Sequence, residues 1–379
     1  MLNAMRRPSL LLASRFAQTS RISPPPSSRR AQTRSSSTSS PSAADDHDFG
    51  RYSVILPEEP YVFGTAHIAP LQVPDHIPRP PYVANVGKEG YDEGQFNGDP
   101  WEGDGLIALG AEEEDQLRSA AKLATEVLEY AGSLVKPGIT TSRIDAVVHQ
   151  YITAHHAYPS PLLYSSFPKS ICTSVNNIIV HGIPDDRPLE LEDLVNIDIT
   201  VYKAGYHGDT SATFPVSPHL DRQGHALTGT TSLALQAGIS ACGPGRPFTA
   251  IGRAIHAAVA AQSKETGMDM CINTQFTGHG IGRVFHRPPW IMHHLNDEPG
   301  IMRPGHCFTI EPAIIQGRNP RGWVFPDGWS ASTCSWLPST SNPALRNNSC
   351  VNGELRPRRP SGAYGSHHRT RRRCPYKTR

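Results

Sequence analysis

The sequence predicts an α+β fold made of two similar halves that face a shared polar cleft. Three observations favour this class. Two β-rich runs within residues 194–214 have the pattern of a hairpin, two pairs of helical segments are each interrupted by a Pro-Gly, and short strand-like segments follow each pair. Helix pairs of this kind bury their apolar faces on a sheet, so each half can form its own core. The 379 residues are enough for one large or two ordinary cores.

The first predicted helix pair starts near Glu112. The apolar residues of "EEEDQLRSAAKLATEVLEYAGSL" recur at helical spacing behind an acidic first turn, which suits the helix dipole. After the break at Pro137-Gly138, Ser142 and Asp145 have the spacing of a capping box and predict the start of the second helix. The segment "LALQAGISACGPGRPFTAIGRAIHAAV" repeats this order of features, which indicates a second half related to the first.

The predicted hairpin contains two aspartates where strands usually carry β-branched residues. If Ala204-Gly205 forms a two-residue turn, Asp209 lies opposite Thr200, and Asp198 lies two residues along the same face. Two carboxylates this close repel one another unless a cation lies between them. The pattern therefore indicates a cation site, and the alternative is an exposed hairpin with solvated aspartates.

Two more charged residues stand in strand-like contexts of the second half, His279 in "GHGIG" and Glu311 in "FTIEPAI". Taken alone, His279 has the simpler interpretation of a buried histidine with a backbone partner. Together with Asp198 and Asp209, these residues form a set of three carboxylates and one imidazole. Such a set suits a divalent ion such as Mn, Fe, Co or Zn and differs from a thiolate site.

Composition argues against several classes of protein. The seven cysteines are odd in number and include no CxxC pair, which argues against a disulfide framework or a zinc ribbon and fits a reducing compartment. No segment approaches the roughly 20 apolar residues of a membrane-spanning helix, so we expect no membrane segment. The net charge of +2 says little about partners because the charge is unevenly distributed along the chain.

Composition also divides the chain into four regions. Residues 1–44 contain seven arginines and many serines but no acidic residue, which is typical of a mitochondrial transit peptide; a generic disordered basic tail is the alternative. Residues 45–110 are rich in Pro and Gly, as in a linker or N-terminal extension. Residues 111–335 hold the predicted elements, and residues 336–379 form an atypical basic tail that we expect to be disordered. We expect a mitochondrial location, or otherwise a cytoplasmic one.

Several long strings between about Glu112 and Thr333 match one known family in the correct order. The stretch "FPKSICTSVNNIIVHGIPDDRPLELEDLVNIDITVYKAGYHGDTSATF" is followed by "GHGIGRVFH", "FTIEP" and "PDGWSAST". These strings closely resemble the type 1 methionine aminopeptidases. The resemblance implies the pita-bread fold of creatinase-like and aminopeptidase-like enzymes, in which two pseudo-twofold halves surround a dinuclear metal cleft. The predicted catalytic domain is 111–335.

The resemblance implies a metal site and an activity. Asp198 would bind one metal ion, Asp209 would bridge two, and His279 and Glu311 would bind the second. The implied cofactors are two divalent ions (Co, Mn, Fe or Zn), and the implied reaction is two-metal hydrolysis that removes the initiator methionine when the second residue is small. The implied partners are nascent polypeptide N-termini, with the ribosome as a further candidate. We expect a monomer that binds neither membrane nor nucleic acid.

The resemblance also implies residues that contact the substrate. His181 and His286 would lie at the scissile bond and act in catalysis together with Glu311, which would carry the proton. Pro161 would lie at the edge of the methionine pocket. The walls of that pocket would be Tyr164, Phe167, Cys172, Phe285 and Trp329. Aromatic walls and a polarisable sulfur suit an unbranched thioether side chain.

One residue that the family supplies is missing from the sequence. The fifth family ligand is a bridging Glu in a "QFEHT"-like strand shortly after the Asp-Gly-Trp segment. After Thr333, Glu354 is the only acidic residue, and its context is not strand-like. Losing a carboxylate that contacts both ions would weaken metal binding. The alternative function is therefore a catalytically impaired binding protein of the same fold.

The sequence is also compatible with two different functions. A proline-directed peptidase or a creatinase-like enzyme would use the same metal residues, although the strings "HGIPDDRPL" and "FPKSICTSVN" favour the methionine group. The ten Arg and Lys residues from Arg346 to Arg379 could bind RNA or a ribosomal surface. Basic runs without regularly spaced aromatic residues are more often only solvated tails.

Overall fold

The structure, a computed structural model, describes residues 50–85 and 106–334. The predicted transit peptide at 1–44 and the predicted tail at 336–379 lie outside this part of the chain, so both stay predictions. All described residues fall in one unit, His47–Arg379. No helix in the described part of the chain has the length and apolar character needed to cross a bilayer.

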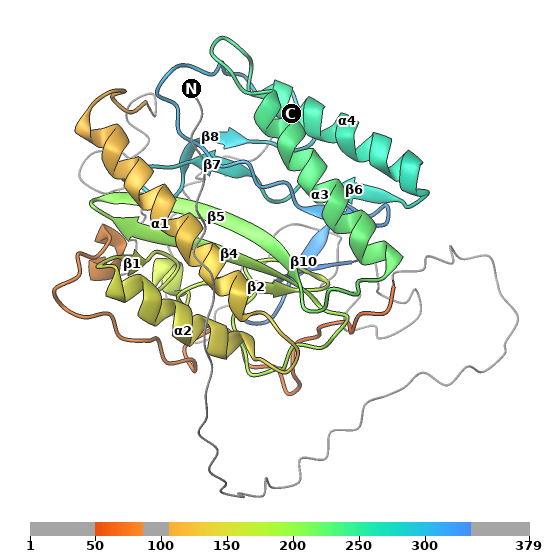
Figure 1. The fold of residues 1–379 in the computed structure, drawn as a ribbon, viewed down its shortest axis with the longest axis horizontal. Coiled ribbons are helices and arrows are strands. Elements are labelled where there is room, and N and C mark those ends of the chain that lie inside the picture. Colours follow the sequence, from red (N-terminus) through yellow and green to blue (C-terminus); the bar gives the residue numbers. More distant parts are fainter. Residues whose placement is uncertain (1–49, 86–105, 335–379) are drawn as a thin grey trace, which may run out of the picture. The chain divides into compact units, whose positions relative to one another are not determined.

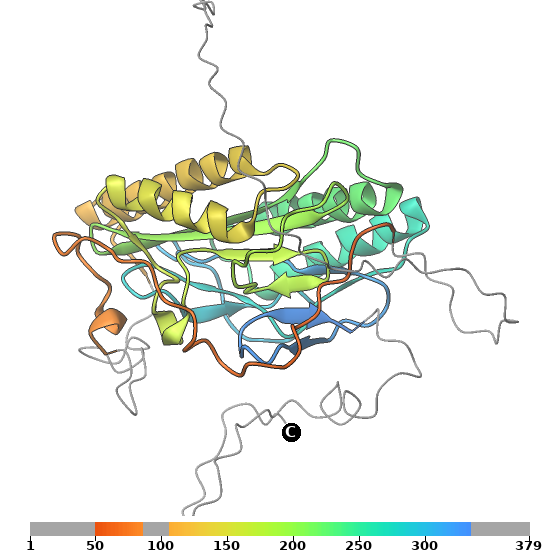
Figure 2. The same cartoon turned by 90° about the horizontal axis from the view of Figure 1, so that it is seen from below.

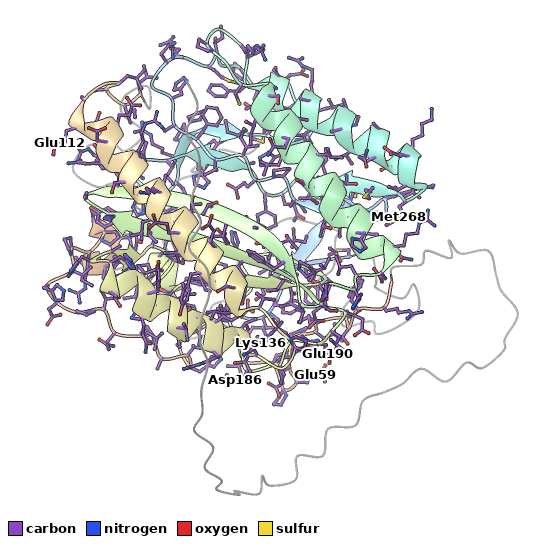
Figure 3. The ribbon with its side chains drawn as sticks, in the orientation of Figure 1. Glu59, Glu112, Lys136, Asp186, Glu190 and Met268 are labelled. Carbon is purple, nitrogen blue, oxygen red and sulfur yellow. The ribbon has the colours of Figure 1, made fainter. Side chains whose placement is uncertain are left out.

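The first helix pair forms where the sequence predicts it. It consists of α1 (Glu112–Leu134) and α2 (Thr141–Ala154). Figure 3 marks Glu112 at one end of α1. The buried residues of α1 recur at helical spacing, from Leu117 to Ala131, so a single stripe of the helix faces the core.

The predicted capping box at the start of α2 is wrong. The side chain of Thr140 caps the helix instead, because its hydroxyl oxygen accepts a hydrogen bond from the Arg143 N–H. Asp145 is fully buried and accepts hydrogen bonds from the backbone N–H groups of Ser170 and Ile171. Its carboxylate thus binds a distant loop and takes no part in capping.

A four-stranded antiparallel sheet lies beside these helices, with β4 (Leu194–Lys203) at its centre. β5 (Tyr206–Pro215) pairs along the whole length of β4 and occupies one edge. β1 (Tyr158–Pro159) and β2 (Cys172–Val175) both pair with the other side of β4. Figure 1 shows α1 lying across β4 and β5.

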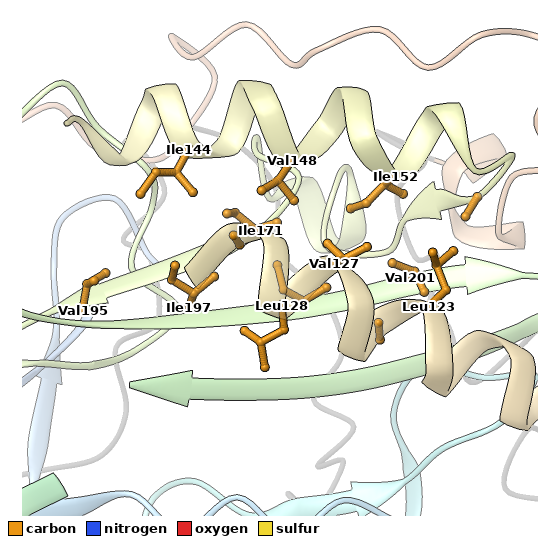
Figure 4. Packing of buried hydrophobic residues seen from close by; sticks show 14 of the residues in the cluster. Leu123, Val127, Leu128, Ile144, Val148, Ile152, Ile171, Val195, Ile197 and Val201 are labelled. Atoms are coloured by element: carbon orange, nitrogen blue, oxygen red, sulfur yellow. The ribbon is translucent and has the colours of Figure 1, made fainter. Parts of the chain in front are cut away.

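The core of the first half lies between the helices and one face of this sheet. Val195, Ile197 and Val201 of β4 are fully buried and pack with Val127 of α1 and Ile144 of α2 (Figure 4). Side chains alternate between the two faces of a strand. The alternate residues Asn196, Asp198 and Thr200 therefore point to the opposite face, away from the helices.

The second half has its own helix pair and shorter strands. The helices α3 (Arg222–Ser240) and α4 (Thr249–Thr266) pack on each other, and Met268 follows the end of α4 (Figure 3). Four short strands form two antiparallel pairs: β6 (Met270–Ile272) with β9 (Ile314–Gln316), and β7 (Gly278–Gly280) with β8 (Arg287–Ile291). Apolar residues from α3, α4 and these strands form a second core around Ile251 and Ile255.

Glu311 does not lie in a strand, contrary to the strand context that the sequence suggests. It stands in an irregular stretch between an isolated bridge at Phe308, which pairs with Gly280, and the start of β9 at Ile314. Pro312 follows directly, and proline has no N–H to donate to a ladder. The strand pairing therefore cannot run through this position.

A three-stranded sheet connects the two halves. Its order is β10 (Gly322–Val324), β11 (Ala331–Thr333) and β3 (Ile178–Val180). β3 belongs to the first half of the sequence, whereas β10 and β11 come from the end of the described residues. In Figure 2 both helix pairs lie on one side of the strands, and residues 50–85, in red and orange, run along the other side.

The described part of the predicted linker, residues 50–85, packs against the first half. Val73 and Ile77 are buried in one apolar cluster with Tyr158 and Leu162, and Tyr82 is also buried. A short 3-10 helix, η1 (Pro81–Asn85), ends the segment. This part of the chain contributes to a core, which a free linker does not do.

Candidate metal and substrate site

The first half supplies two aspartates from its central hairpin. The register places Asp209 opposite Thr200 and Asp198 opposite Ser211, which confirms the predicted pairing and puts both carboxylates on one face. Burial, followed by repulsion from Asp209 and Glu311, holds the pKa of Asp198 well above its usual range. The hairpin thus presents two carboxyl groups away from the helices and close enough to interact.

The second half brings His279 to the same place. Its Nε2 lies 3.5 Å from Asp209 Oδ2 and 3.4 Å from Glu311 Oε1. Its Nδ1 lies 3.1 Å from the Gly280 carbonyl oxygen, so with the proton on Nδ1 the ring presents Nε2 to both carboxylates. Burial lowers the pKa of His279, but the hydrogen bond to Asp209 and the nearby negative charges leave it above the ordinary value.

Thr309 connects His279 and Glu311. The backbone N–H of His279 donates to Thr309 Oγ1 at 2.9 Å, and the Thr309 hydroxyl donates to Glu311 Oε1 at 2.7 Å. The backbone N–H of Glu311 donates to Nε2 of His293, a buried ring whose pKa is lowered to about 4 by burial. Removal from water, opposed by His279, raises the pKa of Glu311 to about 7, although 37% of the side chain stays exposed.

Sequence reasoning missed Thr309 and His293. A signal existed for Thr309, because residues two apart in an extended segment share a face, and Thr309 stands two residues before Glu311. Nothing comparable points to His293, which approaches the Glu311 backbone from a segment 18 residues away.

The oxygen and nitrogen atoms at this site are of the types that bind divalent cations. Within residues 50–85 and 106–334, no group of three or more His, Cys, Asp or Glu side chains is placed so as to hold a metal ion. Asp209 and Glu311 contact the imidazole of His279 instead. Oxygen donors with one imidazole suit hard and borderline divalent ions, and a bound cation would offset the repulsion that raises the pKa of Asp198. The residues therefore fit the cofactor that the sequence predicts.

His181 lies directly after β3 and has a left-handed backbone, with φ at 58°. Non-glycine residues held in this region are strained and cluster at functional sites. Its ring packs edge-on against Trp329 and Phe276, with ring centroids 6.0 and 5.4 Å apart. Burial lowers the pKa of His181 to about 4, so the imidazole is neutral near pH 7.

His286 lies beside His279 in the bend that precedes β8, with the two ring centroids 4.3 Å apart. A hydrogen bond of 2.8 Å joins its Nδ1 to the hydroxyl of Tyr164. The ring of Phe285 stacks on it at 4.0 Å. Burial first, and then the neighbouring histidines, hold the pKa of His286 well below its usual range.

Two aromatic pairs stand beside these histidines. Tyr164 contacts Phe285 with ring centroids 4.9 Å apart, and Phe167 contacts Trp329 at 5.0 Å. Cys172 is buried on β2 directly opposite Asp198. Burial, reinforced by Asp198 and two further aspartates, holds the pKa of the Cys172 thiol well above its usual range. Four of the five predicted wall residues therefore contact, or lie opposite in the sheet, a predicted catalytic or metal-binding residue, and Phe167 is connected to His181 through Trp329.

Pro161 lies at the start of the turn that carries Tyr164, whose backbone N–H donates to the Pro161 carbonyl oxygen at 3.0 Å. The same turn includes the 3-10 helix η3 (Tyr164–Ser166) and ends at Phe167. Ser165 and Ser166 both have positive φ angles, 44° and 68°. This tight turn brings the rings of Tyr164 and Phe167 to the two aromatic pairs.

Comparison with known proteins identifies the class of enzyme to which the chain belongs. Residues 115–348 match the family described as "Metallopeptidase family M24", and the chain belongs to this family. Metallopeptidases of this family use divalent metal ions. The α+β pita-bread fold predicted from the sequence is thereby confirmed.

Within that class the relatives are methionine aminopeptidases. "Methionine aminopeptidase 1D, chloroplastic/mitochondrial" of Arabidopsis thaliana is 45% identical over 267 residues, which cover 69% of this chain and 69% of the relative. "Methionine aminopeptidase 1D, mitochondrial" of Homo sapiens is 42% identical over 279 residues, 74% of this chain and 76% of the relative. The crystal structure of methionine aminopeptidase from Rickettsia prowazekii has a TM-score of 0.57 and 37% identity, and covers 60% of this chain and 90% of that one. The chain is thus a hydrolase of the type 1 methionine aminopeptidase group, as the sequence predicts.

Proposed function

We propose that the protein removes the initiator methionine from nascent chains whose second residue is small. The proposal rests on three residues that the two halves bring together. The carboxylates of Asp209 and Glu311 each lie within 3.5 Å of Nε2 of His279. His181 and His286 stand next to this group as neutral rings. The relatives named above support the same reaction.

The proposed cofactors are two divalent ions, Co, Mn, Fe or Zn. Asp198, Asp209, His279 and Glu311 would hold them. When bound, such ions polarise the peptide carbonyl and lower the pKa of water, which makes a nucleophile available near neutral pH. A cation next to these carboxylates also favours their charged forms.

The remaining chemistry belongs to side chains of the protein. Glu311 takes a proton from the attacking water and returns it to the leaving amine, since its Oε1 is held at the centre of the site by Thr309. His181 and His286 donate hydrogen bonds to the charge that develops on the peptide. Their low pKa values keep both rings neutral, so each carries one N–H and adds no positive charge that would oppose a metal ion.

The substrate preference follows from the walls of the pocket. The pairs Tyr164–Phe285 and Phe167–Trp329, with Cys172, would enclose the unbranched thioether of methionine. Crowding by His181 next to the scissile bond would reject a bulky second residue.

We further propose a mitochondrial location, which is supported by the names of the relatives from Homo sapiens and Dictyostelium discoideum. A fluorescent protein fused to residues 1–44 should then enter mitochondria, and a diffuse cytosolic signal would contradict this.

Peptide cleavage tests the proposed function. Met-Ala-Ser, Met-Lys-Ser and Leu-Ala-Ser peptides are incubated with the protein and excess Mn or Co, and the products are identified by mass spectrometry. From the version with the bridging Glu described below, we expect release of methionine from Met-Ala-Ser and much less cleavage of the other two. Release of Leu at the same rate as Met would contradict the pocket assignment.

The missing bridging Glu requires a second protein in the same experiment. Because Glu354 is the only acidic residue after Thr333, we expect the chain as given to turn over very slowly. A version in which a family-like strand with the Glu replaces the residues after Thr333 should be active. Robust turnover by the chain as given would show that the fifth ligand is dispensable. No turnover by the repaired chain would contradict the peptidase assignment itself.

A further inference from the structure

The N-terminal segment, residues 50–85, precedes the part of the chain that matches the metallopeptidase family, yet it is bonded to the loops that carry the pocket. The backbone N–H of Gly64 donates to the Pro326 carbonyl oxygen at 3.0 Å, three residues before Trp329. The Thr65 hydroxyl donates to the Ser166 carbonyl oxygen at 3.0 Å, in the turn of Tyr164. Figure 2 shows the segment on the side of the strands opposite to the helix pairs.

Tyr82 belongs to this segment and contacts a residue of the pocket wall. Its side chain is buried, and its hydroxyl donates a short hydrogen bond to the carbonyl oxygen of Ser160. Its ring meets the ring of Tyr164 edge-on, with centroids 5.1 Å apart and an interplanar angle of 83°. It also stacks on His207 at 6.3 Å and 21°. Tyr82 therefore touches a wall residue of the pocket directly.

A second series of contacts leads from Tyr82 through the core of the site. Ser160 Oγ lies 2.9 Å from Nδ1 of His207, a ring that is 1% exposed and that burial keeps neutral by lowering its pKa to about 3. His207 stacks almost parallel on Phe285, with centroids 5.2 Å apart and an angle of 9°. Phe285 in turn stacks on His286.

Both series of contacts end at His286. The first runs from Tyr82 to Tyr164, whose hydroxyl hydrogen-bonds to His286 Nδ1, and the second runs through His207 and Phe285. His286 itself stands in a bend and not in a strand, so the backbone ladder does not fix its ring. A ring of this kind must be positioned by its side-chain neighbours.

We propose that Tyr82 is a positioning residue for His286. By holding the ring of Tyr164 and, through Ser160 and His207, the ring of Phe285, Tyr82 fixes both partners that orient the His286 imidazole toward the scissile bond. The proposal rests on the proposed function of His286 in peptide hydrolysis. It assigns a part in the reaction to a segment that precedes the family-matched residues.

The kinetic test compares three substitutions in the repaired, metal-loaded protein. Tyr82→Leu removes both the ring and the hydroxyl, and we expect kcat for Met-Ala-Ser to fall about 10–100-fold while KM changes little, because a misplaced catalytic ring affects the transition state most. Tyr82→Phe keeps the ring contact with Tyr164 and should recover most of the activity. Ile77→Ala is the matched control, because it weakens the apolar packing of the same N-terminal segment without belonging to either series of contacts. An equal loss of kcat in Ile77→Ala would show that general loosening is the cause and would overturn the proposal.

Ser160→Ala tests the second series separately and leaves the N-terminal segment unchanged, so it remains informative if Tyr82→Leu does not fold. It removes the hydroxyl next to His207 but keeps the carbonyl oxygen that Tyr82 binds. We expect a several-fold decrease in kcat. Wild-type kcat in Ser160→Ala, together with a wild-type NMR signal for His286 in the measurement below, would contradict the proposal.

An NMR measurement without metal or substrate separates this proposal from the proposed function. In protein with 13C-labelled histidine, the His286 ring signal is assigned by its loss in His286→Gln. Tyr82→Leu should move this signal because the aromatic rings around it shift, whereas Ile77→Ala should not. A repaired wild type that releases no methionine would contradict the proposed function alone, and the NMR result would still decide whether Tyr82 positions His286. An unmoved signal in Tyr82→Leu would overturn the proposal.

Discussion

The two halves of the protein support their site residues in different ways. In the first half, β4 and β5 pair without interruption from Leu194 opposite Pro215 to Lys203 opposite Tyr206, and Asp198 and Asp209 lie within this ladder. In the second half, His279 lies in a three-residue strand and Glu311 lies outside any strand. Backbone pairing fixes the first two carboxylates, whereas His279 and Glu311 depend also on side-chain hydrogen bonds.

The same contrast appears where the helices meet the strands. In β5, a Cβ atom built on Gly208 would lie 2.3 Å from the backbone carbonyl carbon of Ala120, so α1 packs directly on the strand residue next to Asp209. Any larger residue at this position would force the helix away. In the second half, Thr309 and His293 provide the corresponding support with hydroxyl and imidazole groups. A ladder packed on a helix is rigid over its whole length, whereas side-chain hydrogen bonds of this kind can be removed by single substitutions.

The largest effect should come from removing one proposed metal ligand from each half. Asp209→Ala and His279→Ala should both decrease bound metal and lower turnover at least about 1,000-fold, since several kcal/mol of transition-state stabilisation depend on the ions. Asp209→Ala should lose more metal because Asp209 would bridge. Elemental analysis of the purified proteins measures this, with Ser211→Ala as a control from the same hairpin. Equal metal content in wild type and Asp209→Ala would contradict the assignment.

The next effect concerns the buried Asp145 of the first half. Burial, opposed by N–H groups of Ser170 and Ile171 and by Lys169, raises its pKa to about 6, and its Oδ2 has no hydrogen-bond partner. A raised carboxyl pKa means that the folded state prefers the protonated form. This contribution to stability is complete below the unfolded pKa of about 4 and is lost as the pH rises through about 6.

Asp145→Asn removes this titration and keeps an oxygen that can accept the two N–H groups. Above pH 6 the variant should be more stable than wild type by about 3 kcal/mol, and its free energy of unfolding should change less between pH 4 and 6. Urea unfolding at several pH values measures the difference, with the exposed Asp297→Asn as control. Parallel pH profiles for wild type and Asp145→Asn would show that Asp145 is not responsible.

A smaller effect should follow when the hydrogen-bonded support of the second half is removed. Thr309→Val has nearly the same shape as threonine but loses the hydroxyl that binds the His279 N–H and Glu311, so metal affinity should fall about 10–100-fold. Thr309→Ser should retain most of the affinity because it keeps the hydroxyl. Calorimetric titration with Mn measures the affinities. Unchanged affinity in Thr309→Val would show that the second half is as rigid as the first without this residue.

The smallest effect is expected from a Thr→Val substitution in the first half. Thr173 lies on β2 opposite Ile197, and its buried hydroxyl has no hydrogen-bond partner. Thr173→Val should therefore increase the free energy of unfolding by about 1 kcal/mol, because it removes an unsatisfied polar group and keeps the volume. Urea unfolding measures this, and metal affinity should not change. A loss of stability would indicate a partner for this hydroxyl, such as a buried water.

The sequence by itself determined the hairpin and its carboxylates. The alternation of apolar residues and the length of the turn at Ala204-Gly205 are local properties, and they were enough to place Asp209 opposite Thr200. The start of α1 near Glu112 also follows from a local pattern of apolar spacing and acidic residues. The family strings added the identities of His181 and His286, although their roles stay predictions.

Only the tertiary structure decided how the other site residues are held. The capping box at Asp145 was wrong because its carboxylate binds the N–H groups of a loop 25 residues away, which no local spacing can reveal. The link from His279 to Glu311 through Thr309 and the contact of Tyr82 with Tyr164 likewise join segments that are distant in the chain. Local patterns report which face of a strand or helix a side chain occupies. Contacts between distant segments depend instead on how the completed elements pack, so the short strands and irregular stretches of the second half could not be placed from the sequence alone.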